Sequence, residues 1–307
     1  MALHGLRSVT IGVPNVAETA AYYSEFGLSP DGDGWFRTTD GGRQLRLVSA
    51  PVRRLAELSV AADTRDDIDR IAVGLARLRC SYDPIPGGLS VIEPVTGLTV
   101  RVEVAPRIRQ VPPPAPQYNA PGRAERIGQR AQPLASGPPV RPRRLGHVVI
   151  GSTDCETSCR FFVQGLGFRV SDRIKDTASF LRCSTDHHNL LVSAAPVNFL
   201  HHTSWQVDDI DAVGRGAFAM LEGNPERHVW GLGRHYAGSN FFWYLKDPAG
   251  NFSEYFSDMD CIVDDQLWTP EDLEGAAGLF LWGPPPPPSF LHPDDLAAMM
   301  TGTHSAR

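Results

Sequence analysis

The sequence has few cysteines, no long hydrophobic run and no excess of positive charge. Its five cysteines among 307 residues are scattered and lack the paired spacing of a zinc ribbon. An odd number of isolated cysteines is typical of reduced thiols, so we expect a cytoplasmic protein. No apolar run approaches the ~20 residues of a membrane span, and residues 1–7 do not resemble a signal peptide. We therefore expect no membrane association.

The net charge indicates which classes of partner the protein is expected to bind. A formal net charge of −6 argues against nucleic acid and against an anionic membrane surface. A hydrophobic content of 42% and a charged content of 21% are ordinary for a globular protein. The length allows one large domain or two ordinary ones, either of which can bury a sizeable core. We expect a small-molecule ligand and a homo-oligomer.

Two stretches of the sequence repeat each other. Residues 6–12 resemble residues 145–151, and both have the alternation of a strand. Each leads into a predicted helix, 15–27 or 154–165, which begins with a capping Asn or Asp and ends in Gly. Three strands follow, and the same order then recurs within each half. The sequence thus predicts an α+β fold of paired βαβββ modules, arranged as two tandem domains of two modules each.

The composition also predicts where these units end. We expect an N-terminal domain without a metal site over 1–105 and a C-terminal metal-binding domain over 144–260. The linker between them, 106–143, is rich in proline and arginine, and we interpret its arginines as solvated rather than as a phosphate site. A tail over 261–307 contains tryptophans and a run of prolines. Its aromatic residues are expected to dock on the body, over a pocket mouth or a neighbouring subunit.

The segment 231–256 carries the chemistry around which the chain is organised. It predicts two strands joined by an Asp-Pro-Ala-Gly turn, with His235 in the loop that leads in. Tyr244 and Glu254 lie on these two strands. A carboxylate in the middle of an apolar strand is costly to bury unless a cation meets it, so Glu254 indicates a metal site.

Two upstream histidines can complete this site. His147 lies on the first strand of the second half. In the strand 200–207 the polar face contains His202, so we expect His202 to face the concave side of the sheet and His201 the opposite side. Two imidazoles and one carboxylate form the ligand set of non-haem Fe(II), and Mn(II) suits the same atoms. Zinc would instead suit a lyase or hydrolase.

The first half serves as an internal control for this hypothesis. Aligning the two repeats places Ser8, Ala56 and Arg101 at the positions of the three proposed ligands. This set cannot bind a metal in the same way. If the second-half residues were merely structural, nothing would require all three to be absent together from the first half.

The ordered motifs of the second half resemble those of type I extradiol ring-cleaving catechol dioxygenases, which have the vicinal oxygen chelate fold. The motifs are Leu-Gly-His147, the pairs His187-His188 and His201-His202, Gly-Arg-His235, Tyr244, and Asp-Pro-Ala-Gly-Asn-Phe-Ser-Glu254-Tyr. The resemblance is strong over 144–258 and extends to the first half by repeat pattern. It implies an Fe(II) site at His147, His202 and Glu254, with a catechol and O2 as substrates in aromatic-compound catabolism.

The resemblance also implies roles for three catalytic residues. The acid/base histidine of the family falls on His188, with His187 as the rival that local periodicity does not exclude. His235 and Tyr244 would hydrogen-bond the bound hydroxyl and orient it. A histidine suits the first role because its unperturbed pKa lies near working pH.

Departures from the family pattern bear on the substrate. Members that act on carboxylated catechols carry an Arg before Gly-Arg-His and an Asn two residues after the first ligand. Trp230 and Val149 occupy those places here, and Gly238 stands where some members carry an Asp. We therefore expect an uncharged catechol with an aromatic or alkyl substituent, and Val149, Trp230 and Phe252 as pocket residues.

Two other functions are compatible with such a fold. One is a glyoxalase-like isomerase, but those enzymes share ligands between two repeats, which the first half does not provide. The other is a non-enzymatic protein that binds a small aromatic molecule. Such a binder would not need His147, His202 and Glu254 together.

Overall fold

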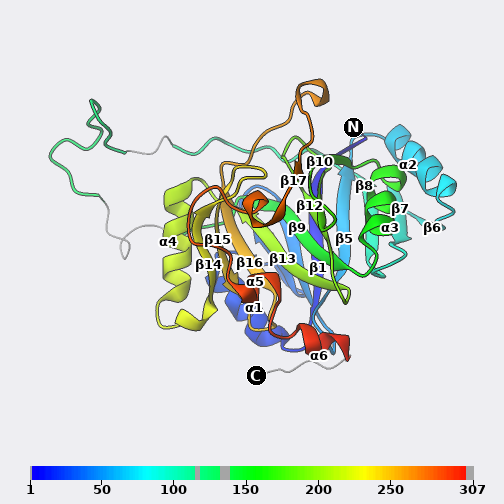
Figure 1. Cartoon of the computed structure of the whole chain (residues 1–307), viewed down its shortest axis with the longest axis horizontal. Coiled ribbons are helices and arrows are strands. Elements are labelled where there is room, and N and C mark those ends of the chain that lie inside the picture. Colours follow the sequence, from blue (N-terminus) through cyan, green and yellow to red (C-terminus); the bar gives the residue numbers. More distant parts are fainter. Residues whose placement is uncertain (1, 115–117, 132–138, 302–307) are drawn as a thin grey trace.

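The computed structural model describes residues 2–114, 118–131 and 139–301 of the chain. Figure 1 shows two mixed sheets side by side, with helices on their outer faces. The first half contains β1 (Leu3–Val13), α1 (Val16–Glu25), β2 (Ser29–Pro30), β3 (Trp35–Thr38), β4 (Gly42–Ser49), β5 (Arg54–Ala62), α2 (Arg65–Arg77), β6 (Tyr82–Ile85), β7 (Gly88–Ile92) and β8 (Thr99–Val104).

The second half repeats this order and continues into the tail. It contains β9 (Arg144–Ser152), α3 (Cys155–Arg160), the π turn η2 (Phe161–Gly165), β10 (Arg169–Ile174), β11 (Ala178–Arg182), β12 (Leu190–Ala194), β13 (Phe199–Gln206), α4 (Ile210–Leu221), η3 (Pro225–Arg227), β14 (His228–Arg234), β15 (Phe241–Lys246) and β16 (Phe252–Ser257). The tail adds η4 (Asp265–Leu267), β17 (Asp272–Leu273), η5 (Gly275–Gly278), α5 (Pro288–Leu291) and α6 (Leu296–Met300).

The strand order shows how the modules combine. The first sheet runs β2-β3-β4-β1-β5-β8-β7-β6, and the second runs β14-β15-β16-β13-β9-β12-β11-β10-β17. In each sheet the first strands of two modules pair antiparallel at the centre, β1 with β5 and β9 with β13. The α+β fold of four βαβββ modules is therefore confirmed. The outermost strand of the second sheet, β17, comes from the tail and pairs parallel with β10.

Helix starts follow the local sequence in three of the four modules. Thr64 and Asp67 form a capping box at α2, and the side chains of Asp154 and Asp209 cap α3 and α4. The expected cap at Asn15 is wrong, because its side chain makes no capping bond. Its amide instead donates to the Pro248 carbonyl in the second half, at 2.8 Å. A contact between the two halves has replaced the local one.

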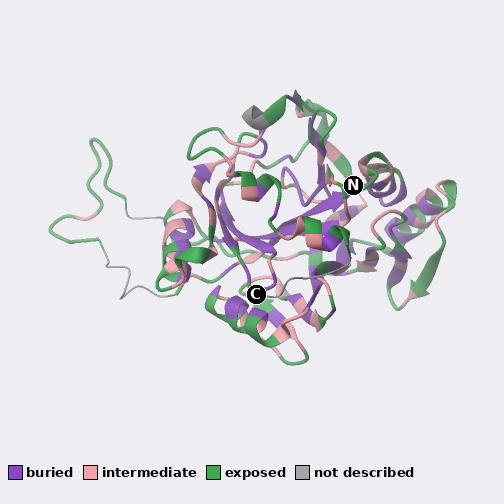
Figure 2. Cartoon of the chain, turned by 60° about the horizontal axis from the view of Figure 1, so that its bottom comes forward, coloured by how far each residue is buried: buried purple, intermediate pink, exposed green. Residues whose placement is uncertain are grey.

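The main hydrophobic cluster extends across both halves, and Figure 2 shows buried residues concentrated on the strands. The ring of Phe26, after α1, stacks on Tyr255 of β16 with centroids 3.9 Å apart. The Tyr255 hydroxyl also donates to the Phe26 carbonyl at 2.7 Å. On the other side of the interface, Gly74 of α2 leaves no room for a side chain against the Gly165 carbonyl. The two sheets are thus packed together through their helices.

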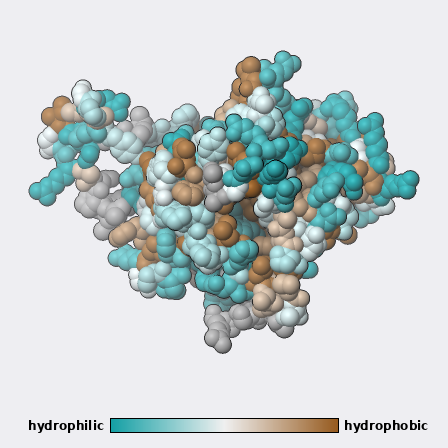
Figure 3. Space-filling view, in the orientation of Figure 1, coloured by the Kyte–Doolittle hydropathy of each residue, from teal (hydrophilic) through white to brown (hydrophobic). Residues whose placement is uncertain are grey.

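Polar contacts surround this core. On the face in Figure 3, hydrophilic residues predominate and hydrophobic ones form small groups. Arginines of the linker pair with acidic residues of the body, Arg107 with Asp63 and Arg143 with Asp40.

None of the helices in the described ranges is both long enough and apolar enough to span a bilayer.

The sheet register corrects the expected alignment of the two repeats. His147 pairs with Ser204, which pairs with Glu254, whereas in the first sheet Ser8 pairs with Ser59 and Ser59 with Arg101. The residue equivalent to His202 is therefore Glu57, and the expectation of Ala56 is wrong by one position. Both central strand pairs bulge at equivalent residues, Ala56 and His201, so Ala56 corresponds to His201 and not to His202. The first-half set is Ser8, Glu57 and Arg101, which includes no histidine.

A bulge also corrects the orientation of His201. The pairing of β13 with β9 shifts between Leu200 and His202, so His201 is the inserted residue. Strict alternation would place His201 and His202 on opposite faces, but both line the same cavity. The prediction that His201 lies on the far side is wrong for this reason.

The stacked pair between the halves gives a stability prediction. Replacing Tyr255 with Phe keeps the ring stack but leaves the buried Phe26 carbonyl without its donor, at a cost of about 1–3 kcal/mol. The urea midpoint should fall, while Tyr82→Phe, at an exposed strand residue, should leave it unchanged. Equal urea midpoints for the two variants would contradict the expected contribution of this hydrogen bond to stability.

Candidate metal centre

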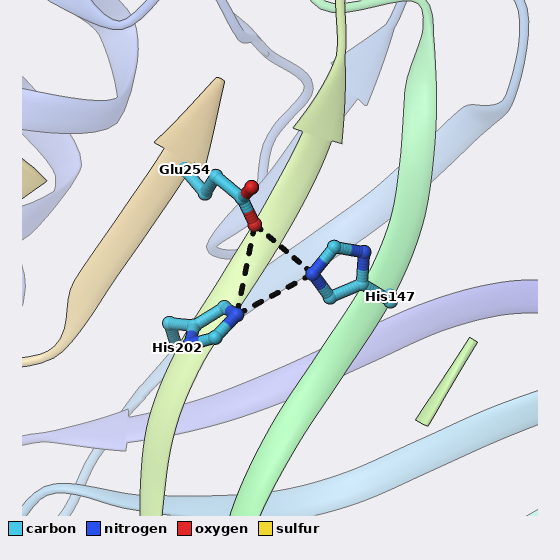
Figure 4. A group of neighbouring side chains, drawn as sticks. All are labelled: His147, His202 and Glu254. Carbon is cyan, nitrogen blue, oxygen red and sulfur yellow. Dashed lines mark hydrogen bonds and ion pairs between the residues drawn. The ribbon is translucent and has the colours of Figure 1, made fainter. Parts of the chain in front are cut away.

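Three neighbouring strands at the middle of the second sheet bring His147, His202 and Glu254 together (Figure 4). Oε2 of Glu254 lies 3.0 Å from Nε2 of His147 and 3.6 Å from Nε2 of His202. The two imidazole Nε2 atoms are 3.4 Å apart. Cis ligands at ~2.1 Å from one metal ion are about 3.0 Å apart, so the three atoms need to move little to share one ion.

The buried carboxylate of Glu254 tests whether a cation fits. Glu254 is fully buried, and its Oε2 has no hydrogen-bond partner within the described residues. Its other oxygen, Oε1, accepts a hydrogen bond from the Asn240 amide at 3.1 Å. Oε2 is thus the atom left facing the two histidines. A buried anionic oxygen without a donor is strongly unfavourable, and a divalent cation removes that penalty.

Burial keeps the second ligand in its metal-binding form. Desolvation, with a contribution from the neighbouring His201, lowers the pKa of His202 well below its usual value. The imidazole is therefore neutral at pH 7, and neutral imidazole is the form that ligates metals. Nδ1 of His147 is buried with no partner among the residues that the structure describes.

His188 lies beside the metal centre. Its ring centroid is 4.3 Å from that of His147, and burial lowers the pKa of His188 well below the usual value. His187 lies behind it, with the two Nδ1 atoms 3.0 Å apart, and Nε2 of His187 lies 2.8 Å from Asp172. Only His188 of this pair lines the cavity, so the geometry favours His188 over His187 as the residue that meets substrate.

His235 and Tyr244 form a second polar pair in the cavity wall. Nε2 of His235 lies 2.8 Å from the Tyr244 hydroxyl. Nδ1 of His235 is hydrogen-bonded to the Leu279 carbonyl, so Nε2 carries the lone pair and accepts from Tyr244. Burial and then the Glu254 carboxylate raise the pKa of Tyr244 well above 10, which keeps its hydroxyl protonated. Asn240 and Leu279 complete this side of the site.

A cavity of about 410 Å³ opens from the metal centre. Most of its lining is apolar, including Val149, Phe180, Leu191 and, from the tail, Phe290 and Leu296. Lysine, arginine, aspartate and glutamate are absent from the lining found in the described ranges.

The three expected pocket residues are placed differently. Val149 lines the cavity, whereas Trp230 and Phe252 do not. Both are nearly fully buried in an aromatic cluster with Phe242, Tyr244 and Phe290. Trp230 stacks on Tyr244 with centroids 5.6 Å apart, and Phe252 contacts His201 edge to face. Trp230 and Phe252 thus pack behind the residues that line the cavity.

The sequence reasoning missed Asn240, His201 and the tail residues Leu279 and Phe290. Asn240 is a fully buried amide before an aromatic strand, a signal of a required hydrogen bond that could have marked it. The tail residues carry no such local signal. Their positions depend on how a segment distant in sequence packs across the second sheet.

Comparisons with known proteins agree with this geometry. Residues 144–255 match the model of the Glyoxalase/Bleomycin resistance protein/Dioxygenase superfamily. Metapyrocatechase 2 of Cupriavidus necator is 31% identical over 312 residues, which cover 94% of this chain and 92% of that protein. An iron-dependent extradiol dioxygenase of Rhodococcus jostii is 29% identical over 45% of this chain and 50% of its own length.

A solved structure shows the same fold over the whole chain. The Mn(II)-bound glyoxalase from Novosphingobium aromaticivorans superposes with a TM-score of 0.73 at 24% identity, covering 94% of each chain. The fold and the His-His-Glu site define a metal-dependent enzyme of the vicinal oxygen chelate class. The chain belongs to the extradiol ring-cleaving dioxygenases of this superfamily, which are oxidoreductases that use iron or manganese.

The ligand set predicts the effect of removing its carboxylate. Replacing Glu254 with Ala should abolish retention of Fe(II) or Mn(II), because it removes the anionic ligand. The matched control is Glu57→Ala, at the register position of His202 in the first sheet, and it should retain wild-type metal content. Metal content after desalting, measured by plasma mass spectrometry, checks both. Metal retained by Glu254→Ala would remove this residue from the site.

Proposed function

We propose that this protein opens the aromatic ring of an uncharged catechol beside its diol, using O2 and a metal at His147, His202 and Glu254. The observation that carries the proposal is the cluster of these three side chains, of which His147 and His202 line an apolar cavity. His188 lies on one side of them and the His235–Tyr244 pair on another. Fe(II) or Mn(II) bound there would supply open coordination positions for the diol and O2 and the electron transfer between them.

His235 and Tyr244 are proposed to orient the diol. The Tyr244 hydroxyl and Nε2 of His235 are both within the cavity wall, and Nε2 can accept a proton from a catechol hydroxyl that displaces its hydrogen bond from Tyr244. Burial lowers the pKa of His235, although the Glu254 carboxylate opposes this effect, so the free imidazole is a neutral acceptor. Trp230 behind Tyr244 limits the movement of the phenol ring.

His188 is proposed as the residue that moves a proton on the O2 side. Its ring contacts those of His147 and Phe180, and it lines the cavity. Negative charge that develops on O2 during ring opening requires a nearby proton donor. A cavity-lining imidazole held by His187 can take a proton from the substrate and return it at this point.

The composition of the cavity supports an uncharged substrate. A carboxylated catechol would bury its charge among apolar side chains, with histidine as the sole basic residue type in the described lining. A volume of about 410 Å³ exceeds what an unsubstituted catechol needs, which leaves space for an apolar aryl or alkyl group. Val149, Leu191 and Phe199 line the part of the cavity that would receive it.

The cysteines bear on the cellular compartment of the protein. All five cysteines are free in the structure, which supports a reducing compartment such as the cytoplasm. Assembly into a homo-oligomer stays a prediction that light scattering in solution would check.

The substrate proposal leads to a direct measurement. Fe(II)- or Mn(II)-loaded protein should consume O2 with 3-phenyl- or 3-alkylcatechols and form a yellow ring-opened product. The kcat/KM for these should exceed that for a catechol carboxylate by about tenfold or more, since one unpaired buried charge costs at least that much. A preference for the carboxylate would contradict the substrate class. Lack of O2 uptake with every catechol would favour an isomerase instead.

The proposed role of His188 predicts a separation of binding from chemistry. His188→Phe should retain its metal but turn over about 10²- to 10⁴-fold more slowly, as loss of a general acid–base group does. His228→Phe, an exposed histidine on β14, is the control and should match wild type. Normal turnover by His188→Phe would assign proton transfer to another residue.

A further inference from the structure

Three hydrogen-bond chains lead from the histidines of the metal centre to the backbone of the tail. Each chain has its outer end on a main-chain group between residues 271 and 290. Main-chain N–H and C=O groups have a fixed donor or acceptor character. The Phe290 and Leu279 carbonyls therefore decide which nitrogen of His201 and of His235 carries the proton, while the Glu271 amide anchors the Asp172 carboxylate to which His187 is bonded.

The first chain ends at the metal ligand His202. The Phe290 carbonyl lies 2.7 Å from Nε2 of His201, and since a carbonyl can only accept, this nitrogen donates. Nδ1 of the neutral His201 then bears the lone pair. It lies 2.8 Å from Nδ1 of His202 and accepts its proton. Nε2 of His202 is left with its lone pair directed at His147 and Glu254, which is the tautomer that can bind a metal.

The second chain ends at His188. The amide of Glu271 donates to Oδ1 of Asp172, whose other oxygen lies 2.8 Å from Nε2 of His187. His187 donates to this carboxylate, and its Nδ1 accepts from Nδ1 of His188. Nε2 of His188 consequently carries the lone pair. The third chain is the shorter one already described, from the Leu279 carbonyl through His235 to Tyr244.

A buried ion pair holds the tail in this position. Arg53, between β4 and β5 of the first sheet, forms two hydrogen bonds to the Asp295 carboxylate, at 2.6 and 2.9 Å. The Arg53 side chain is 0% exposed. The same guanidinium donates to the Leu200 carbonyl on β13 and to the Asn251 amide oxygen before β16. One residue of the first half thus joins the tail to two strands that carry metal ligands.

We propose that the tail is a positioning element of the active site, which fixes the proton positions on His202 and His235 through two of its carbonyls and supports the Asp172 carboxylate behind His188, and that the Arg53–Asp295 ion pair holds the Phe290 end of the tail in register. The proposal rests on the metal site of the proposed function. It gives the first half, which lacks the ligand set, a role in the reaction. His147 is outside this arrangement, since its Nδ1 has no partner in the described part of the chain.

The first test replaces His201 in the full-length protein. His201→Phe keeps an aromatic ring but removes the acceptor for Nδ1–H of His202, so Mn(II) should bind about 10- to 100-fold more weakly, as on loss of other groups that orient metal-ligating histidines. His201→Gln places an amide oxygen near the same position and should recover part of this affinity. Affinity is measured by titrating the metal-free protein with Mn(II) and following free Mn(II) by electron paramagnetic resonance.

The second test loosens the tail without touching a histidine. Asp295→Asn removes the charge that Arg53 pairs with while keeping the side-chain shape. Imidazole ¹⁵N spectra of the metal-free protein should then change for His201 and His202 from single tautomers (Nε2–H for His201, Nδ1–H for His202) to averaged ones. The matched control is Glu25→Gln, which removes the charge from another ion pair between the halves, Arg227–Glu25, and should leave the spectra and Mn(II) affinity unchanged.

These outcomes distinguish a tail that positions the histidines from a tail that only covers the cavity. Wild-type Mn(II) affinity in His201→Phe, or wild-type tautomers and affinity in Asp295→Asn, would overturn the proposal. If His201→Phe fails to fold, the Asp295→Asn spectra decide alone. Neither readout uses a catechol or O2. Absence of ring-cleaving activity would therefore overturn the proposed function. The tautomer and Mn(II) affinity measurements would still test the role of the tail.

Discussion

The structure depends on a carboxylate held without solvent at the centre of a sheet. Glu254 is fully buried, and Asn240 satisfies one oxygen while the other faces the imidazoles of His147 and His202. Burial lowers the pKa of His202, so this imidazole offers no positive charge to compensate the carboxylate. A divalent cation would compensate it and would give the two histidines their function. Next to this point the sheet places an apolar cavity.

The two halves show how one architecture can serve two purposes. Both sheets join their modules through the same central register, yet Ser8, Glu57 and Arg101 stand where the second sheet has its ligands. The first half instead contributes the hydrophobic core that it shares with the second, through contacts such as Phe26 on Tyr255. It also contributes Arg53, which reaches across to the tail. The first half thus supports the fold, and the second half contains the proposed metal site.

The histidines of the second half act through pairs of neighbours along the chain. In both His187-His188 and His201-His202 the Nδ1 atoms face each other, and Nε2 of the first residue is hydrogen-bonded to a group of another segment. A bulge in β13 makes the latter arrangement possible, because it brings two successive side chains to one face. The outer partners are the Asp172 carboxylate and the Phe290 carbonyl. The orientation of each inner ring is consequently set by the fold.

The sequence by itself predicted the repeat of βαβββ modules, which the structure confirms, and a metal site in the second half at His147, His202 and Glu254, which the structure brings together. These features follow from local alternation, from turn residues and from the cost of burying Glu254, all of which are legible in short segments. It also identified His188, His235 and Tyr244 as neighbours of that site. Tertiary structure decided what those local rules cannot express. The bulge brought His201 to the cavity, because strand irregularities depend on pairing with distant strands, and the register identified Glu57 rather than Ala56 as the equivalent of His202. Trp230 and Phe252 lie behind the wall, and tail carbonyls reach the histidines, because packing between segments far apart in the chain decides which atoms meet.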